Sequence, residues 1–179
     1  TEGIQEAINE VKLTGGCVLI APGTYSVKDI LLSGAQGVTI GGAGSHKTDL
    51  SKGTILKAAP GATNVLKVLN CQKCTIENLV LDGNSIATKT LFVDSTNAPV
   101  TTMNTFRNLY LLGGTQVDID IGTGTYQNDL TLWENVVVDG SGSVAAVRIG
   151  DSSSSNILMH TFILCTFSAI GSCPYDVLI

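Results

Sequence analysis

Six residues on short alternating segments carry the side chains that sugar chemistry requires. In the segment VDIDI from Val117, apolar residues alternate with aspartates, so Asp118 and Asp120 should point outward if the apolar residues face a core. Similar segments recur along the chain: LKVL from Leu66, LFVD from Leu91 and VRIG from Val147. Stacking them on their first residues predicts one exposed row of candidates: Asp94, Asp118 and Asp120 for catalysis, and Phe92, Arg148 and Lys67 for substrate binding.

This row would suit glycoside hydrolysis. In the predicted register Asp94 lies beside Asp120, and Phe92 lies beside Asp118, which faces Arg148 on its other side; neighbouring strands are about 4.8 Å apart. Two carboxylates act about 5–5.5 Å apart in retaining enzymes and about 6.5–9.5 Å apart in inverting ones, and an aromatic ring can stack on a sugar. A Ca²⁺ site, a purely glycan-binding site and a solvated polar face are the alternatives. A register shift of two residues would separate the cluster.

Other reactive side chains have simpler interpretations. Asp82 and Asp139 each precede a glycine at the end of an apolar segment, which is typical of a turn, and catalysis there is the less favoured reading. The five cysteines, an odd number without regular spacing, do not describe a disulfide framework: Cys17, Cys71, Cys74, Cys165 and Cys173. Cys71 and Cys74 have the spacing of half a zinc site, but no further cysteine or histidine lies close in sequence. We therefore expect buried, hydrophobe-like cysteines, no metal and no cofactor other than Ca²⁺ at the acidic cluster.

The elements that must position these residues repeat along the chain. The segments TIENLVLDGN, TFRNLYLLGG and LWENVVVDGS align on Asn78, Asn108 and Asn135, about one coil's length apart. A weaker fourth copy, MHTFILCTFS, places Thr161 at the same point. Short parallel strands that repeat in register predict the all-β class and a parallel β-helix, a solenoid of stacked coils.

Aligning the copies also predicts columns of side chains. The three asparagines should form an inward ladder at a turn, each amide bonding the next coil. One residue earlier, an ion-pair ladder is favoured over a catalytic role for Glu134; it comprises Glu77, Arg107, Glu134 and His160. A third column is apolar and outward, which predicts packing against another chain or another part of the protein: Val80, Tyr110, Val137 and Ile163.

The sequence predicts one domain, residues 1–179, which we expect to be part of a longer chain. Residues 1–14 should form an amphipathic helix that caps the solenoid, because Ile4, Ala7, Ile8 and Val11 share one helical face. Residues 17–179 should form the coils. Residues 45–53 interrupt the repeat and predict a protruding loop, a second candidate for partner contact.

The first 27 residues, TEGIQEAINEVKLTGGCVLIAPGTYSV, resemble the opening of pectate-lyase-superfamily (pectin-lyase-like) domains. The likeness lies in the helix motif GIQEAI, the Gly15-Gly16 turn, an apolar strand and the motif PGTY, which lacks the family's usual residue between Pro and Gly. Such domains occur in phage tail spikes, appendages and glycoside hydrolases. The resemblance implies a right-handed parallel β-helix, often trimeric in phage proteins, that acts on polysaccharides. The catalytic motifs of polygalacturonases and pectate lyases are absent, so no reaction is implied.

Composition limits the partners. Ten scattered lysines and arginines and a net charge of −5 argue against nucleic acid, and the apolar runs are too short to insert in a membrane. Hydrophobic residues make up 44% and charged residues 14%, which favours a homo-oligomer (a trimer) or a larger assembly. We expect a virion or extracellular, tail-spike-like β-helix that recognises a cell-surface polysaccharide, with or without cleaving it. The alternatives are a free polysaccharide lyase or glycoside hydrolase and a non-catalytic structural β-helix.

Overall fold

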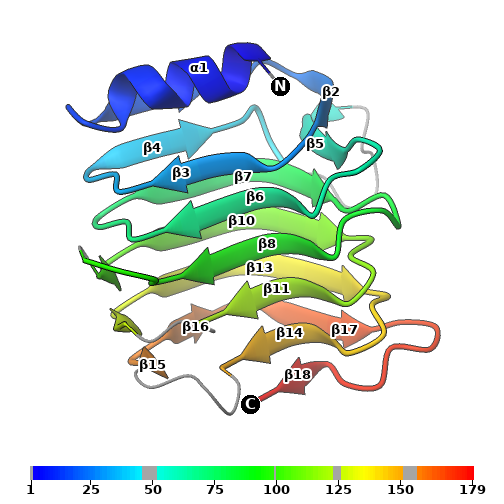
Figure 1. Cartoon of the computed structure of the whole chain (residues 1–179). Helices are drawn as coiled ribbons and strands as arrows, with labels where there is room; N and C mark the ends of the chain where they lie inside the picture. The colour runs from blue at the N-terminus through cyan, green and yellow to red at the C-terminus, as the bar shows by residue number, and fades with distance from the viewer. Residues whose placement is uncertain (1, 46–51, 99, 123–125, 151–156) are drawn as a thin grey trace.

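The computed structural model is a parallel β-solenoid of about five turns (Figure 1). It describes residues 2–45, 52–98, 100–122, 126–150 and 157–179. Strands account for 53% of the residues and a short helix lies at the N-terminus, so the predicted all-β solenoid with a helical cap is confirmed. The right-handed sense of the coil stays a prediction. Within the described ranges, no helix is long and apolar enough to cross a membrane.

Parallel strands stack into three sheets that run along the solenoid (Figure 1). The largest has the order β1 (Gly16–Leu19), β4 (Val38–Gly41), β7 (Thr75–Asp82), β10 (Thr105–Leu112), β13 (Leu132–Gly140) and β16 (Thr161–Ile163), with β2 (Gly23–Val27), β5 (Thr54–Ala58) and β17 (Thr166–Ala169) beside this path. The second contains β3 (Ile30–Ser33), β6 (Asn64–Leu69), β8 (Lys89–Asp94), β11 (Val117–Ile121), β14 (Ala145–Ile149) and β18 (Val177–Leu178). The third contains β9 (Thr101–Thr102), β12 (Asn128–Asp129) and β15 (Ile157–Leu158).

One continuous apolar core runs through the middle of the coils. Alternate residues of each strand point inward, so Leu91 and Val93 of β8 and Ile119 and Ile121 of β11 are all buried in it. Equivalent positions stack on one another from coil to coil, and burying them is the main favourable contribution to folding. The strands therefore form because their inward residues are apolar and β-branched in many cases.

The helix α1 (Glu2–Val11) caps the N-terminal end of this core and is shorter than the span of residues 1–14 that the sequence predicted. Ile8 is fully buried, and Ile4, Ala7 and Val11 pack against the same cluster. The Gln5 amide also pairs with the edge strand β3: its Oε1 accepts from the Leu31 N–H at 2.8 Å and its Nε2 donates to the Leu31 carbonyl at 2.9 Å. The helix thus covers both the open core and part of an exposed strand edge.

The asparagine ladder forms between coils, although not in the core interior. Asn108 Nδ2 donates to Asn78 Oδ1 at 3.0 Å, and Asn135 Nδ2 donates to Asn108 Oδ1 at 2.9 Å. Asn78 and Asn108 are half-buried and Asn135 is exposed, so the predicted inward placement is wrong. All three have φ of 51–56°, a left-handed conformation that asparagine tolerates because its short amide bonds locally. The ladder marks a bend within each long strand.

The fourth copy is shifted from its predicted alignment. Glu77, Arg107 and Glu134 are in register as expected, and Arg107 Nε lies 2.5 Å from Glu77 Oε2. Ile163, not His160, lies opposite Glu134. The residue after Ile163, Leu164, therefore takes the position of the ladder asparagines, and it has the same left-handed backbone, with φ of 54°.

The outward apolar column is buried by neighbours within this chain. Val80, Tyr110 and Val137 are in register as predicted. Ile55 precedes them in the same column, opposite Val80. Ile55, Val80 and Tyr110 are buried in a second cluster, with Val137 packed against it. Ile163 belongs to another row and is exposed. Of the predicted loop at 45–53, residues 46–51 lie outside the described residues.

Candidate functional site

The predicted register of the second sheet is wrong by two residues on both sides of β11, towards β8 and towards β14. Asp120 pairs with Phe92, not Asp94, and its partner on the other side is Arg148. Lys67 pairs with Phe92 as expected. The shift keeps Ile119 and Ile121 in the core, opposite Leu91 and Val93. Because side chains alternate with a period of two, a two-residue shift leaves the inward and outward sets unchanged and is invisible in the sequence pattern.

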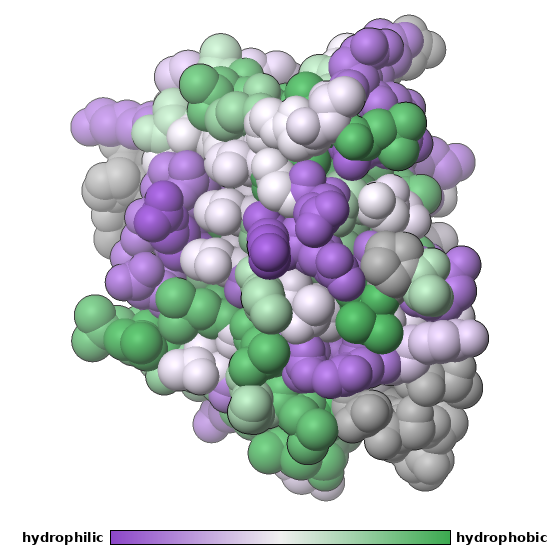
Figure 2. Space-filling view, turned by 90° about the vertical axis from the view of Figure 1, so that its left-hand side faces the viewer, coloured by the Kyte–Doolittle hydropathy of each residue, from purple (hydrophilic) through white to green (hydrophobic). Residues whose placement is uncertain are grey.

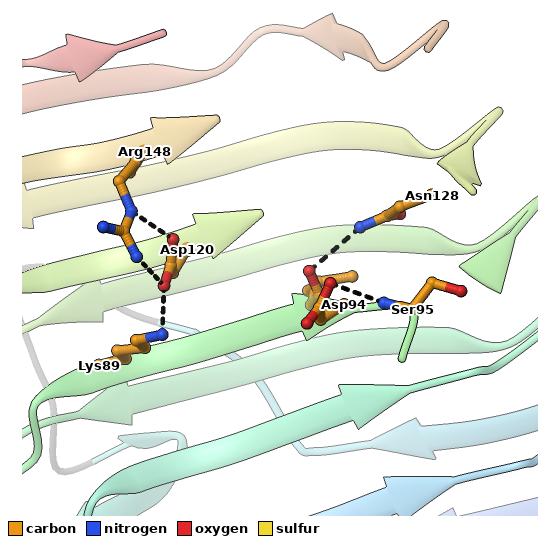
Figure 3. Close-up of polar contacts among 7 residues, drawn as sticks. Lys89, Asp94, Ser95, Asp120, Asn128 and Arg148 are labelled. Carbon is orange, nitrogen blue, oxygen red and sulfur yellow. Dashed lines mark hydrogen bonds and ion pairs between the residues drawn. The ribbon is translucent and has the colours of Figure 1, made fainter. Parts of the chain in front are cut away.

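Asp120 is held as a structural ion pair. Arg148 Nε donates to its Oδ1 and Arg148 Nη2 to its Oδ2, both at 2.7 Å, and Lys89 Nζ lies 2.5 Å from Oδ2 (Figure 3). The carboxylate is fully buried beneath these two cations. Bidentate and multiple charge-assisted bonds satisfy both oxygens. Asp120 is therefore poorly placed to exchange a proton with a substrate.

Two lysines cover Phe92 and leave little of its ring exposed for stacking on a sugar. Lys89 Nζ lies 3.9 Å from the ring centroid and Lys67 Nζ lies 5.2 Å from it, both within cation–π range. Phe92 is 8% exposed. The row of Lys67, Phe92, Asp120 and Arg148 thus exists, but its members contact one another. We interpret it as an electrostatic clamp between coils.

The other two predicted carboxyl groups lie apart from this row. Asp94 is a diagonal neighbour of Asp120 at the end of β8; its Oδ1 accepts from the Ser95 N–H at 2.7 Å (Figure 3). Asp118 is fully buried, and its Oδ1 accepts from Thr90 Oγ1 at 2.7 Å and from the Gly114 N–H at 2.9 Å. The expected exposed face is therefore absent at all three aspartates, which are 0–3% exposed.

A cleft of about 340 Å³ lies instead over the ends of β7, β10 and β13. It is lined by Asp82, Asn84, Ser85, Tyr110, Leu112, Gly113, Asp139, Ser141 and Ile170. Asp82 and Asp139 are both in register with Leu112, one strand to either side of it. Their backbones are therefore two strand spacings apart, roughly 9–10 Å. Tyr110 Oη donates to Asp139 Oδ2 at 2.8 Å, and Lys57 Nζ lies 3.5 Å from Asp82 Oδ2.

The electrostatics of the cleft are dominated by negative charge. Burial, together with the hydrogen bond to Asp139, raises the pKa of Tyr110 to about 12, so the phenol stays protonated and donates. Burial also raises the pKa of Asp118 to about 6; hydrogen bonds from Gly114, Thr90 and the Ser141 backbone oppose this rise, and the charge of Asp82 adds to it. Asp118 Oδ2 is buried and has no hydrogen bond of normal geometry among the described residues.

The sequence did contain a signal for this cleft. Asp82 does serve a turn, since its Oδ1 accepts from the Asn84 N–H at 2.7 Å. The turn interpretation was thus correct for Asp82, yet it led away from the site. Asp82, Leu112 and Asp139 occupy one column of the aligned repeats, and Tyr110 lies two residues before Leu112. This column, taken with Tyr110, predicts that the side chains of Asp82, Tyr110 and Asp139 lie together where β7, β10 and β13 end.

The described parts of the chain contain no set of side chains that could form a metal centre. No group of three or more His, Cys, Asp or Glu side chains there could hold a metal ion. The Ca²⁺ site considered at Asp94, Asp118 and Asp120 has no such geometry. His160 is used internally: Trp133 Nε1 donates to its Nδ1, and its Nε2 contacts the Asn128 carbonyl, both at 3.1 Å.

Comparison with known proteins adds no relative: no protein-family model, curated protein or solved structure matched the chain.

Proposed function

We propose that this β-solenoid recognises a cell-surface polysaccharide through the cleft between Asp82 and Asp139, in the manner of the pectate-lyase-superfamily domains that its first residues resemble. The observation that carries the proposal is the cleft on the outside of the coils, where Tyr110 and two carboxylates converge. Concave sites with a few convergent polar groups are where small ligands bind. The setting that suits this function is a virion or the extracellular space.

The chemistry of the lining favours a neutral or amino sugar. Carboxylates accept hydrogen bonds from sugar hydroxyls, and Asn84, Ser85 and Ser141 add groups that donate or accept. The described residues that line the cleft include two carboxylates and no lysine or arginine, and Lys57 lies beside Asp82. A polyuronate would bring further negative charge and be repelled.

Binding fits the cleft better than cleavage does. The backbones that carry the two carboxyl groups are roughly 9–10 Å apart, close to the upper end of the carboxyl separation in an inverting glycosidase. That mechanism requires one of them protonated and the other ionised. Lys57 lies beside Asp82, and Tyr110 donates its hydroxyl to Asp139, so each carboxyl group already has a partner within the protein. We therefore place recognition first and cleavage second.

A glycan array with matched variants tests this proposal. We expect the protein to bind neutral or amino-sugar glycans, and Asp139→Asn or Tyr110→Phe to weaken binding by about tenfold or more, since each change disturbs a charge-assisted bond. Glu134→Gln, a loss of the same charge on the ion-pair ladder outside the cleft, should bind normally. Unchanged binding by both cleft variants, or a preference for polyuronates, would contradict the proposal. A reducing-end assay on the bound glycan reports whether cleavage occurs.

A second candidate, assembly, is favoured by an exposed apolar stripe. Met103, Leu130 and Met159 follow residues paired across β9, β12 and β15, and they are 49%, 41% and 65% exposed. All three have left-handed backbones, with φ of 50–56°. Figure 2 shows apolar surface gathered towards the lower, C-terminal coils on this side of the solenoid. Such patches commonly mark interfaces.

Sedimentation velocity tests the assembly candidate. We expect a mass of three chains, which falls to one chain when Met103 and Leu130 are both replaced by glutamine. A monomer of the unaltered protein at micromolar concentrations would remove the reason for this candidate.

A further inference from the structure

Two buried cysteines flank one corner of the solenoid, between β6 and β7. Cys71 and Cys74 are 0% and 1% exposed, and both side chains belong to the core cluster. The corner is made by left-handed residues at Asn70 and Lys73, with φ of 54° and 55°. These two turns of the backbone direct both thiols to the same, inner side.

A side chain from the next coil fixes the width of this corner. Asn104 is buried; its Nδ2 donates to the Cys71 carbonyl and its Oδ1 accepts from the Cys74 N–H, both at 2.9 Å. The amide thus bridges the two groups that would bond directly in a tight turn. It holds Cys71 and Cys74 at a set separation, so their side chains stay adjacent in the folded protein.

Each thiol changes the pKa of the other. The interaction with Cys74 is the largest cause that raises the pKa of Cys71 above its usual range, and the interaction with Cys71 is the largest cause that lowers the pKa of Cys74 to about 7. Their other partners are backbone carbonyls, including those of Leu32, 3.4 Å from Cys71 Sγ, and Ala35, 3.6 Å from Cys74 Sγ. Neither contact is a strong hydrogen bond, because the thiol is a weak donor.

We propose that Cys71 and Cys74 are a modification site that takes an intramolecular disulfide when the chain folds in an oxidising medium. The oxidant is a small-molecule disulfide such as oxidised glutathione. The Cys74 thiolate attacks one of its sulfurs and releases one glutathione thiol. Cys71 then loses its proton and attacks Cys74 in the mixed disulfide, which releases the second thiol. Two protein thiols are oxidised and one disulfide is reduced to two thiols.

Burial determines when this bond forms and how long it lasts. The exchange requires access to sulfur, so it must occur while the corner is open, before the coils close over it. Once the coils have closed, the same burial keeps reductants away from the bond. The short loop between the cysteines limits the gain, and we expect the oxidised protein to melt roughly 4–8 °C above the reduced one.

Refolding in a glutathione redox buffer tests the proposal. The protein is denatured, reduced, refolded with and without the redox pair, and alkylated under denaturing conditions before peptide mapping. We expect Cys71 and Cys74 to be joined after refolding with the redox pair, and the folded product to resist a small-molecule reductant that cleaves it after denaturation. Cys17, which is exposed, serves as the internal control for reagent access and should label in the native state.

Variants separate this pairing from incidental oxidation. Cys71→Ser should leave Cys74 without an internal partner, and the melting temperature of this variant should be the same with or without the redox pair. Cys17→Ser should keep the linkage, since it removes only the exposed thiol. Alkylation of both Cys71 and Cys74 after refolding with the redox pair would overturn the proposal, as would their preferential pairing with Cys17, Cys165 or Cys173.

Discussion

Replacing Asp118 by asparagine isolates the free-energy cost of burying a carboxylate beside the cleft. The carboxyl is fully buried, its Oδ1 accepts two hydrogen bonds and its Oδ2 has no partner among the described residues. Burial raises its pKa to about 6 from the ordinary value of 3.8. A raised pKa means that the folded state holds the proton more tightly than the unfolded state.

The sign and size of the effect follow from that difference. The contribution of Asp118 to stability is fully present below pH 3.8, where both states are protonated, and is lost as the pH rises through 6. One pKa unit corresponds to about 1.4 kcal/mol, so the ionised form costs about 3 kcal/mol at pH 7 relative to low pH. Between pH 4 and pH 7 the change is about 2 kcal/mol, because Asp118 of the unfolded chain is already partly ionised at pH 4.

Urea unfolding of the wild-type protein and Asp118→Asn at pH 4, 5 and 7 measures this change. Asparagine can keep the Oδ1 bonds from Thr90 and Gly114 and carries no charge. We expect the stability of the variant relative to the wild type to rise by about 2 kcal/mol between pH 4 and pH 7. Other carboxyl groups titrate in both proteins and largely cancel in the difference. Glu10→Gln, on the exposed face of α1, is the matched control and should show a small difference that changes little with pH.

A difference between wild type and Asp118→Asn that does not change with pH would refute the reasoning. It would mean that Asp118 is ionised at the same pH in both states, and that water reaches Oδ2. A fall in the relative stability of the variant as the pH rises would be stronger evidence still, because it would show that the carboxylate is favoured by a cation.

Three further changes should give measurable results. Burial lowers the pKa of His160 below its ordinary value of 6.5. The stability that its neutral form contributes is therefore present above pH 6.5 and is lost as the pH falls from there through the lowered pKa of the folded state. The stability of the wild type relative to His160→Gln, from urea unfolding at pH 5 and 7, should fall on acidification, and an unchanged difference would contradict this. Arg148→Met should lower the free energy of unfolding in urea by about 2–4 kcal/mol, because Asp120 stays buried with one cation fewer. Adding Asp120→Asn to this variant should recover part of that loss, and no recovery would argue against the ion pair. Leu164→Asn should raise the melting temperature by roughly 1–4 °C, because asparagine fits the left-handed backbone at this position and can extend the asparagine ladder. A lower melting temperature would show that the asparagine ladder ends at Asn135.

The architecture could be predicted because repeats leave a direct record in the sequence. Asn78, Asn108 and Asn135 recur in one motif, and this alone indicated stacked coils and the correct pairing of β7, β10 and β13. The helical face at Ile4, Ile8 and Val11 indicated the cap for the same reason, since its apolar periodicity is local. The predicted register of the last coil was wrong because Leu164 occupies the position where the repeated motif has asparagine, and the fourth copy was therefore misaligned.

In the second sheet, the sequence by itself determined which side chains point into the core and which point out, because that follows from alternation along each strand. It could not determine register: a shift of two residues preserves the alternation, and only the packing of complete coils decided that Asp120 lies between Phe92 and Arg148. Nor could it determine burial of the outward residues, since Lys89 and Arg148 cover Asp120 from neighbouring strands. The cleft depends on both. It exists because Asp82, Tyr110 and Asp139 come from three successive coils, and distances across coils are set by tertiary stacking.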